Sequence, residues 1–171
     1  MIVLEIGCGK EGERAHSWPG PTITVDNDPE VGADVTADVL ALPFEDNYAD
    51  AVLASHIIEH LFYRTVPSAL REWLRVLKPG GHLYLFTPDL GWAAQEIVEG
   101  RFNAGTIAYI YGSEVTGGQC HHCLFTQAAL EQLLTETGFQ VARSRCNKRG
   151  FAIRFDRRYD VPDVEVVGKK P

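Results

Sequence analysis

The chain has 171 residues, of which 45% are hydrophobic and 23% are charged, and its formal net charge is −7. This length and composition predict a single globular domain with a sizeable hydrophobic core. The sequence has no apolar run long enough to span a membrane and no secretory signal at its start, so we expect a cytoplasmic protein. The acidic balance disfavours nucleic acid as a partner, because phosphate backbones are bound mainly by lysine and arginine.

The first predicted element is a buried strand over residues 2–6, which leads directly into a glycine turn. Apart from Glu5 the strand is apolar, and Gly7 and Gly9 follow it. Glycines permit positive φ and let a ligand approach the backbone without meeting a Cβ. Because ligands of α/β proteins bind at the carboxyl ends of such strands, the turn is the predicted centre of the binding site. The Glu5 carboxylate beside it is expected to have a hydrogen-bonding or cationic partner.

Two cofactors fit this turn. The segment Gly7-Cys-Gly-Lys-Glu-Gly12, with an acidic Asp26 downstream, matches the G-x-G-x-x-G pattern of dinucleotide-binding enzymes. That pattern requires a helix directly after the loop, because the N-terminus of the helix holds the pyrophosphate. Residues 11–21 contain two glycines, two prolines and no apolar face, so we expect no regular helix there. The sequence therefore favours a cofactor without a pyrophosphate, such as S-adenosylmethionine, over NAD.

Alternating strands and helices are predicted along the rest of the chain. Further strands are expected over residues 22–26, 35–38, 48–54, 82–87, 139–146 and 151–156. The strand over 48–54 is nearly all apolar, as a central parallel strand should be, and it delivers Ser55 and His56 to the carboxyl edge of the sheet.

Helices are predicted where apolar residues recur with helical spacing. They are expected over residues 65–77, capped by Thr65, and over 126–137, capped by Thr126 and followed by Gly138 at the C′ position. Residues 29–39 are too few and too interrupted by glycine for the helix that usually joins two parallel strands.

Five segments of the sequence carry a family resemblance by their order. They are Val3–Gly9, Val25–Pro29, Ala37–Phe44, Ser55–Leu61 and Arg75–Gly81. Together they resemble the class I S-adenosylmethionine-dependent methyltransferases of the type 11 kind. The resemblance implies an α/β fold that is Rossmann-like and three-layered, with a mostly parallel seven-stranded sheet that ends in an antiparallel C-terminal hairpin. It also implies S-adenosylmethionine as the cofactor and methyl transfer as the activity.

The resemblance further implies which residues bind the cofactor. The predicted set is Glu5, Gly7, Cys8, Gly9, Asp26, Asn27, Asp38, Val39, Ser55 and His56. Asp26 ends the second strand, where a carboxylate can accept hydrogen bonds from both ribose hydroxyls, and Asp28 is its close alternative. Asp38 and Val39 stand at the position that contacts the adenine in the family.

The chain departs from the family where the cofactor is usually covered. It begins on the first strand, so we expect the N-terminal cover helices and the first two connecting helices to be absent or vestigial. The long connection 88–123 carries four aromatic residues, and long connections of this kind often serve as lids. We therefore expect one domain over 1–171, with 88–123 as a substrate or lid insertion. The alternative is a surface insertion or a contact in a homodimer.

Candidate catalytic residues follow from the chemistry of methyl transfer. An oxygen or carbon acceptor usually needs a base, and histidine titrates near neutral pH, so His56 and His121 are the predicted bases. His56, Glu59 and His60 share one helical turn and resemble the Glu-x-x-Glu-His metal motif of small-RNA 2′-O-methyltransferases and ubiquinone-pathway O-methyltransferases. Many metal-free members of the family also carry Glu-His-Leu here, so we predict no metal.

The four cysteines do not indicate a disulfide scaffold in a domain of this size, so we expect free thiols. Cys120 and Cys123 have the spacing of half a zinc site, but the sequence has no second pair of this kind.

The acidic surface favours a small molecule, sugar or lipid precursor as the acceptor. One alternative is a binding module that keeps the cofactor fold without turnover. Another is methylation of a nucleic acid or a protein, with seven basic residues between 143 and 158 as the docking surface. We prefer to interpret these charges as the solvated face of an edge hairpin.

Overall fold

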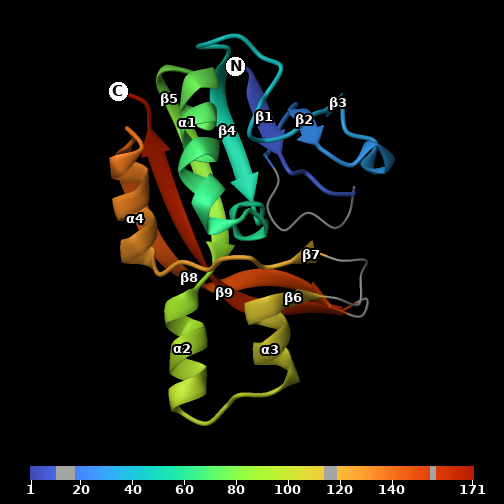
Figure 1. Cartoon of the computed structure of the whole chain (residues 1–171), viewed down its shortest axis with the longest axis vertical. Coiled ribbons are helices and arrows are strands. Elements are labelled where there is room, and N and C mark those ends of the chain that lie inside the picture. Colours follow the sequence, from blue (N-terminus) through green and yellow to red (C-terminus); the bar gives the residue numbers. More distant parts are fainter. Residues whose placement is uncertain (11–17, 114–118, 155–156) are drawn as a thin grey trace.

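The computed structural model describes residues 1–10, 18–113, 119–154 and 157–171. Seven strands form one mixed sheet in the order β3-β2-β1-β4-β5-β9-β8 (Figure 1). The strands are β1 Val3–Ile6, β2 Ile23–Asp26, β3 Val35–Thr36, β4 Ala49–Ser55, β5 Leu77–Pro88, β8 Gln140–Arg154 and β9 Arg157–Lys169. Strands β1 to β5 pair in parallel, and β9 is antiparallel to both of its neighbours. The predicted Rossmann-like sheet with an antiparallel C-terminal hairpin is confirmed.

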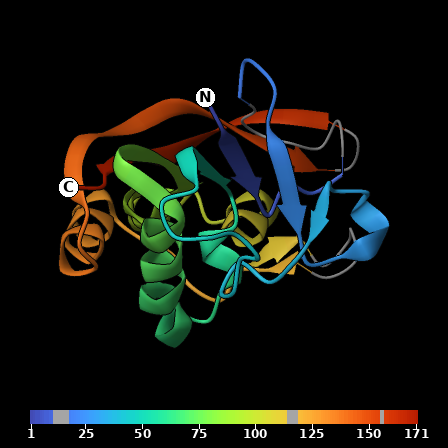
Figure 2. The same cartoon turned by 90° about the horizontal axis from the view of Figure 1, so that it is seen from above.

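The hydrophobic core lies between this sheet and two helices, α1 Val66–Val76 and α4 Gln127–Glu136, which lie on the same side of the sheet in Figure 2. The predicted apolar stripe of α1 is buried, with Trp73 at its centre and fully enclosed. On the opposite face the Tyr84 ring of β5 packs edge-on against Trp18, at 5.2 Å between ring centroids. None of the described helices is long and apolar enough to cross a membrane.

The fifth strand begins earlier than predicted. We expected Lys78-Pro-Gly-Gly81 to end the helix before the strand, but β5 already starts at Leu77. The backbone of the two glycines pairs with Lys170: the N–H of Gly80 donates to the Lys170 carbonyl at 3.0 Å, and the Lys170 N–H donates to the Gly81 carbonyl at 2.9 Å. A partner far along the chain therefore extends a strand across residues that favour a turn.

The predicted residues of the C-terminal hairpin are wrong. Most of the expected strands 139–146 and 151–156 lies in one long strand, β8, and the second strand of the hairpin is β9; residues 155 and 156 lie outside the described residues. The Asn147–Gly150 segment has the composition of a turn, but the structure uses it for a register shift between β8 and β9. In β9, Val164 and Val166 are fully buried in the core.

Two helix caps were predicted, and one is confirmed. The Thr126 hydroxyl accepts a hydrogen bond from the Ala129 N–H at 3.3 Å and caps α4. The prediction for Thr65 is wrong, because its hydroxyl donates to the Phe62 carbonyl at 2.8 Å. A short 3₁₀ helix, η3 Tyr63–Thr65, precedes α1 and uses the threonine in this way.

The segment after β5 lies beyond the carboxyl ends of the parallel strands (Figure 1). It contains α2 Leu90–Val98, α3 Ala104–Tyr111, and the small strands β6 Gly112–Ser113 and β7 Gln119–Cys120. Asp89 caps α2 by accepting from the Gly91 N–H at 2.8 Å, and Asn103 caps α3 by accepting from the Gly105 N–H at 2.8 Å. The predicted lid segment therefore contains two capped helices.

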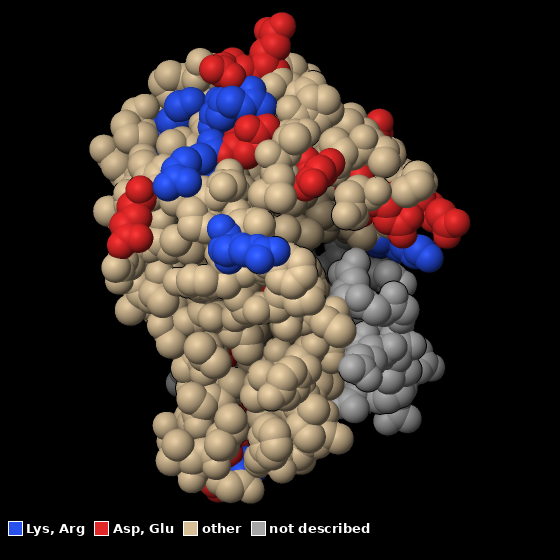
Figure 3. Space-filling view, viewed as in Figure 1, with Lys and Arg blue, Asp and Glu red and all other residues tan. Residues whose placement is uncertain are grey.

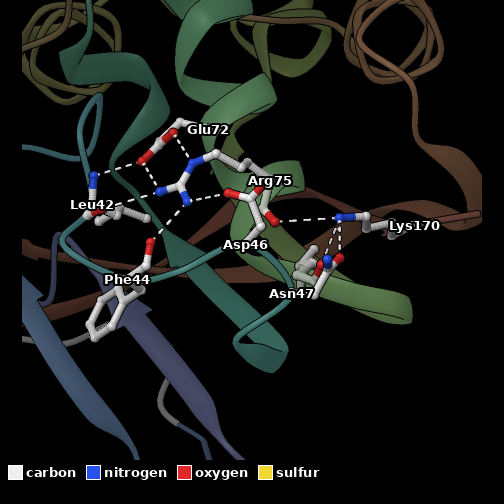
Figure 4. A network of polar contacts seen from close by, with 8 residues as sticks. Leu42, Phe44, Asp46, Asn47, Glu72, Arg75 and Lys170 are labelled. Atoms are coloured by element: carbon white, nitrogen blue, oxygen red, sulfur yellow. Dashed lines mark hydrogen bonds and ion pairs between the residues drawn. The ribbon is translucent and has the colours of Figure 1, made fainter.

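Arg75 of α1 binds the loop over residues 42–46, which follows the predicted adenine contacts Asp38 and Val39 (Figure 4). Its guanidinium donates to both carboxylate oxygens of Glu72, at 2.7 and 2.8 Å, and to the carboxylate of Asp46 at 2.8 Å. It also donates to the carbonyls of Leu42 at 3.2 Å and Phe44 at 2.8 Å. These contacts use all five donors of the side chain, so one residue holds the loop against the helix.

We expect Arg75→Lys to lower the free energy of unfolding by about 2 kcal/mol, because an ammonium cannot reproduce a planar fork that binds carboxylate and carbonyls together. Urea unfolding followed by circular dichroism measures this change. Arg71→Lys, at an exposed position of the same helix, is the matched control and should leave stability nearly unchanged. Equal effects of the two substitutions would show that the network contributes little.

Candidate active site

The carboxyl ends of β1, β2 and β4 meet at the point where the strand order of the sheet reverses. β1 lies between β2 and β4, and ligands of doubly wound sheets bind in the crevice at such a point. The turn after β1 is held there by the Cys8 N–H, which donates to the Val25 carbonyl of β2 at 3.2 Å. Both Gly7 and Gly9 have φ of +60°, a conformation that glycine adopts without strain.

The two glycines of the turn have different reasons to lack a side chain. A Cβ on Gly7 would lie 2.6 Å from the side chain of Ile57, so Gly7 is required by packing. A Cβ on Gly9 would meet no atom within 4 Å. The turn is therefore packed on one side and open at Gly9, where a ligand can lie against the backbone.

Asp26 stands directly beside the open glycine. Its carboxylate accepts from the Gly9 N–H at 2.9 Å and from the Asp28 N–H at 3.0 Å, and the residue is buried. Asp28 instead caps the short helix η1 Pro29–Val31, accepts from the Glu30 N–H at 2.9 Å, and is exposed like Asn27. The geometry therefore favours Asp26 over Asp28 for a ribose contact, which stays a prediction.

The other predicted cofactor contacts surround this point. Glu5 is buried beneath the turn and accepts from the Thr22 hydroxyl at 3.4 Å. Asp38 is exposed and accepts from the Leu40 N–H at 2.9 Å, as an aspartate in a turn does. Val39 is buried, and its carbonyl accepts from the indole N–H of Trp73 at 3.0 Å. These residues are held in defined positions, and their roles toward the cofactor stay predictions.

His56 follows β4, beside Ser55, which ends the strand. Its φ is +54°, which is uncommon outside glycine and points to a functional constraint. Its Nδ1 lies 3.0 Å from the carboxylate of Glu59, which is fully buried, and its Nε2 lies 4.0 Å from the carboxylate of Asp163. An ionised carboxylate only accepts, so Nδ1 carries a proton and Nε2 is the ring nitrogen that can accept one.

Burial and hydrogen bonding have opposite effects on the pKa values of His56 and Glu59. Burial lowers the pKa of His56, but the hydrogen bond that it donates to Glu59 and the charges of Glu59 and Asp163 together outweigh burial, so the pKa is raised above its ordinary value. Burial raises the pKa of Glu59, but the hydrogen bond from His56 and the nearby histidines together outweigh burial, so the pKa is lowered. The pair therefore favours an ionised Glu59, which stabilises the positive charge that His56 gains when its Nε2 takes a proton.

His60 and His121 also lie close to the Glu59 carboxylate. His60 ends the 3₁₀ helix η2 Ile58–His60, and its ring packs edge-on against the ring of His121 at 4.9 Å. Glu59 thus lies beside both His56 and His60, as its spacing in the sequence indicated, and His121 joins them from the segment after β7. Burial lowers the pKa of His121. The predicted role of His121 as a second base stays a prediction.

The segment after β7 is fastened to η2 by backbone contacts. The N–H groups of His122 and Cys123 donate to the Glu59 carbonyl at 2.7 and 3.3 Å. The Cys123 thiol donates to the carbonyls of Ile58 at 3.4 Å and Leu61 at 3.3 Å, and burial raises its pKa to about 11. This cysteine is therefore a protonated structural thiol, and all four cysteines are thiols, as predicted.

Sequence reasoning missed three residues of this site. The Thr87 hydroxyl donates to Glu59 at 3.1 Å, and its place at the end of a predicted strand was a usable signal. Asp163 approaches His56 from β9, and Tyr109 of α3 donates its hydroxyl to the Pro162 carbonyl at 2.5 Å. Neither was identifiable without β9, because both interactions depend on a strand that the local sequence does not indicate.

Comparison with known proteins identifies the family. A model of the methyltransferase domain matches residues 4–85. A methyltransferase-family protein of Encephalitozoon cuniculi is 30% identical over 156 residues, which is 82% of this chain and 70% of that protein. The chain belongs to the class I S-adenosylmethionine-dependent methyltransferases. S-adenosylmethionine is the cofactor of this methyltransferase family.

Further relatives share parts of this methyltransferase. The ubiquinone/menaquinone biosynthesis C-methyltransferase of Chromobacterium violaceum is 41% identical over 56 residues, 33% of this chain and 22% of that protein. The matched parts span only 22% to 28% of the first curated relatives. A methyltransferase structure from Methanosarcina mazei has a TM-score of 0.68 and 18% identity, and the match covers 99% of this chain and 92% of that one. This likeness shows the shared fold.

Proposed function

We propose that this methyltransferase domain transfers a methyl group from S-adenosylmethionine to an oxygen or carbon atom of a small molecule, sugar or lipid precursor. The observation that carries the proposal is His56, held in a left-handed conformation at the end of β4 with Nδ1 on a fully buried glutamate. Oxygen and carbon acceptors must lose a proton, whereas a neutral amine can react without a base. A positioned histidine therefore favours the first two classes.

The cofactor half of the proposal uses the crevice beside Gly9. The adenosine would lie against the open backbone there, with Asp26 on the ribose and Asp38 and Val39 beside the adenine. Ser55 and His56, at the end of β4, would flank the reactive methyl group. The sulfonium itself makes the methyl electrophilic, so the protein supplies binding, alignment and exclusion of water.

The acceptor half uses His56 and the segment over 88–123. The Nε2 atom of His56 takes the proton of the acceptor, while Glu59 holds the Nδ1–H and stabilises the imidazolium that forms. The segment reaches this site through β7, because His60 Nδ1 lies 3.1 Å from the Cys120 carbonyl. We therefore propose that residues 88–123 form the acceptor side of the site.

Surface charge supports a small acceptor over a nucleic acid. In Figure 3 the face of α2 and α3 that is turned to the viewer is mostly uncharged. Along this segment Ile97, Val98, Phe102, Ile107 and Tyr111 have exposed side chains, and the charged Arg101 pairs with Glu96 and Glu99. Two of the seven basic residues near the C-terminus, Arg143 and Arg145, already pair with the buried carboxylate of Glu165, so they contribute less to a docking surface for phosphates.

Calorimetric titration with S-adenosylhomocysteine and with NAD tests the cofactor half, and only the former is expected to bind. Incubation with S-adenosylmethionine and fractions of a metabolite extract, followed by mass spectrometry, tests for turnover and identifies the acceptor. Binding of NAD alone would refute the proposal. Binding of S-adenosylhomocysteine without turnover on any fraction would leave a silent binding module.

We expect Asp26→Asn to weaken the binding of S-adenosylhomocysteine by about 1.5–3 kcal/mol, which is the range for a hydrogen bond to a charged group. The variant keeps the size of the side chain but loses one acceptor oxygen and the charge. Asp28→Asn is the matched control and should bind as the wild type does. If calorimetry shows the reverse order, the ribose contact belongs to Asp28.

A further inference from the structure

Three side chains, those of Glu59, His60 and His121, form a cluster of which the proposed mechanism for His56 uses only Glu59. A carboxylate oxygen of Glu59 and one ring nitrogen each of His60 and His121 all lie within 4.8 Å of one another. Glu59 is fully buried, and the two histidines are partly buried. We infer that this cluster is a binding site for a divalent transition-metal ion such as Zn²⁺.

The hydrogen bonds of the two histidines set the protonation of their rings. His60 Nδ1 lies 3.1 Å from the Cys120 carbonyl, and His121 Nδ1 lies 3.1 Å from the Tyr109 carbonyl. A carbonyl oxygen only accepts, so Nδ1 is the protonated nitrogen of each neutral ring and Nε2 keeps a lone pair. Histidines that bind metals almost always donate their other ring N–H in this way. Both rings therefore already have the tautomer that a metal ligand requires.

The set of donors fits a metal with an open coordination position. Two imidazoles and one carboxylate are the ligands of many catalytic zinc sites, where water or substrate takes the fourth position. In a tetrahedral site with bonds of about 2.0–2.1 Å, the ligand atoms lie about 3.3 Å apart. The three donors, now at most 4.8 Å apart, reach this spacing by small rotations of their side chains.

The surroundings hold the cluster in place. The second carboxylate oxygen of Glu59 accepts from the Thr87 hydroxyl at 3.1 Å. The Glu59 carbonyl accepts from the N–H of His122, which directly follows His121. The ligand that comes from η2 and the ligand that follows β7 are thus fixed relative to each other before an ion binds. Hydrogen bonds of this kind to the ligand residues are typical of metal sites in proteins.

A role for the ion in turnover rests on the proposed function. An ion with an open position beside His56 would bind the oxygen of the acceptor and lower the pKa of its hydroxyl group. Transfer of the hydroxyl proton from the acceptor to His56 would then be more favourable. Binding of the ion itself does not depend on turnover, so it can be measured before the acceptor is known.

The test is a metal titration of untagged protein that has been stripped with a chelator. We expect the wild type to bind one Zn²⁺ per chain by calorimetry and to give visible absorption bands with Co²⁺. His60→Ala and His121→Ala should each bind at least about 100-fold more weakly, because losing even an outer partner of a ligand costs about 10–100-fold. His122→Ala, at an exposed histidine that stacks on Phe62, is the matched control and should bind as the wild type does.

Titration of the same preparations with S-adenosylhomocysteine separates this inference from the proposed function. Unchanged cofactor binding in His60→Ala and His121→Ala, with loss of the metal, supports the site and shows that the variants are folded. A wild type that binds no ion, or variants that bind it as tightly as the wild type, would overturn the inference while the proposed function stands. A wild type that fails to bind S-adenosylhomocysteine would refute the proposed function alone.

Discussion

Replacing His56 by asparagine is expected to lower the rate of methyl transfer about 10²–10⁴-fold, the usual contribution of a general base. Asparagine tolerates the left-handed backbone of this position and can still donate to Glu59, but it cannot take a proton. The affinity for S-adenosylhomocysteine should stay within a few-fold of the wild type. The measurement is the formation of S-adenosylhomocysteine under saturating cofactor, with the acceptor found by the extract screen.

The control for this prediction is His82→Asn. His82 lies in β5, six residues before the carboxyl end of the strand, and should have no effect on the rate. Full turnover in His56→Asn would remove the base from the mechanism. The domain would then act by alignment alone, which would favour an amine as the acceptor.

Replacing Trp73 by alanine is expected to lower the free energy of unfolding by about 3–5 kcal/mol. Trp73 is fully buried at the centre of α1, and its removal leaves a large cavity between the helix and the sheet. This loss is a large part of the stability of a typical domain. Chemical unfolding followed by circular dichroism measures it.

Trp73→Phe separates packing from hydrogen bonding at the same position. Phenylalanine fills much of the volume but leaves the Val39 carbonyl without its indole donor, which should cost about 1–3 kcal/mol. Because Val39 is a predicted adenine contact, we also expect weaker binding of S-adenosylhomocysteine in this variant. A loss in Trp73→Phe as large as that in Trp73→Ala would show that the hydrogen bond, and not the packing, holds the loop.

Much of the sheet was predictable because its parallel strands carry strong local signals. The apolar runs that became β1 and β4 end in glycine or polar residues at the crevice, so both the strands and their functional ends were visible in the sequence. The helical periodicity of α1 likewise identified Trp73 as a core residue. The two strands and the helix are predictable because their patterns involve residues that are close together in the sequence.

The C-terminal hairpin was not predictable, because distant partners decide it. Asn147 and Gly150 favour a turn locally, but β9 pairs along the whole of β8 and extends the strand through them. β9 itself contains Pro162, Asp163 and Glu165, which are poor strand formers by propensity. They are tolerated because the Arg143 and Arg145 side chains neutralise Glu165, and Asn147 donates to Asp163 at 2.8 Å.

The candidate site also combines features that the local sequence indicates with features that depend on distant partners. Gly7, Gly9, Asp26 and His56 lie at strand ends that the sequence indicated, and the structure brings them to one edge of the sheet. The contacts that orient His56 and its neighbours come partly from β9 and the segment after α3, which lie far away in the sequence. Local patterns therefore indicated the reacting groups better than the groups that position them.

The position of β9 has a consequence for how the chain acquires its structure. β9 follows β8 in the sequence, yet it lies inside the sheet, between β5 and β8. Pro88 pairs with Asp163 and His82 pairs with Lys169, so the sheet stays incomplete until this strand has been synthesised. Pairing over such distances slows folding and leaves an open strand edge in the meantime. The nascent chain would therefore expose the unpaired edge of β5 until β9 has been synthesised.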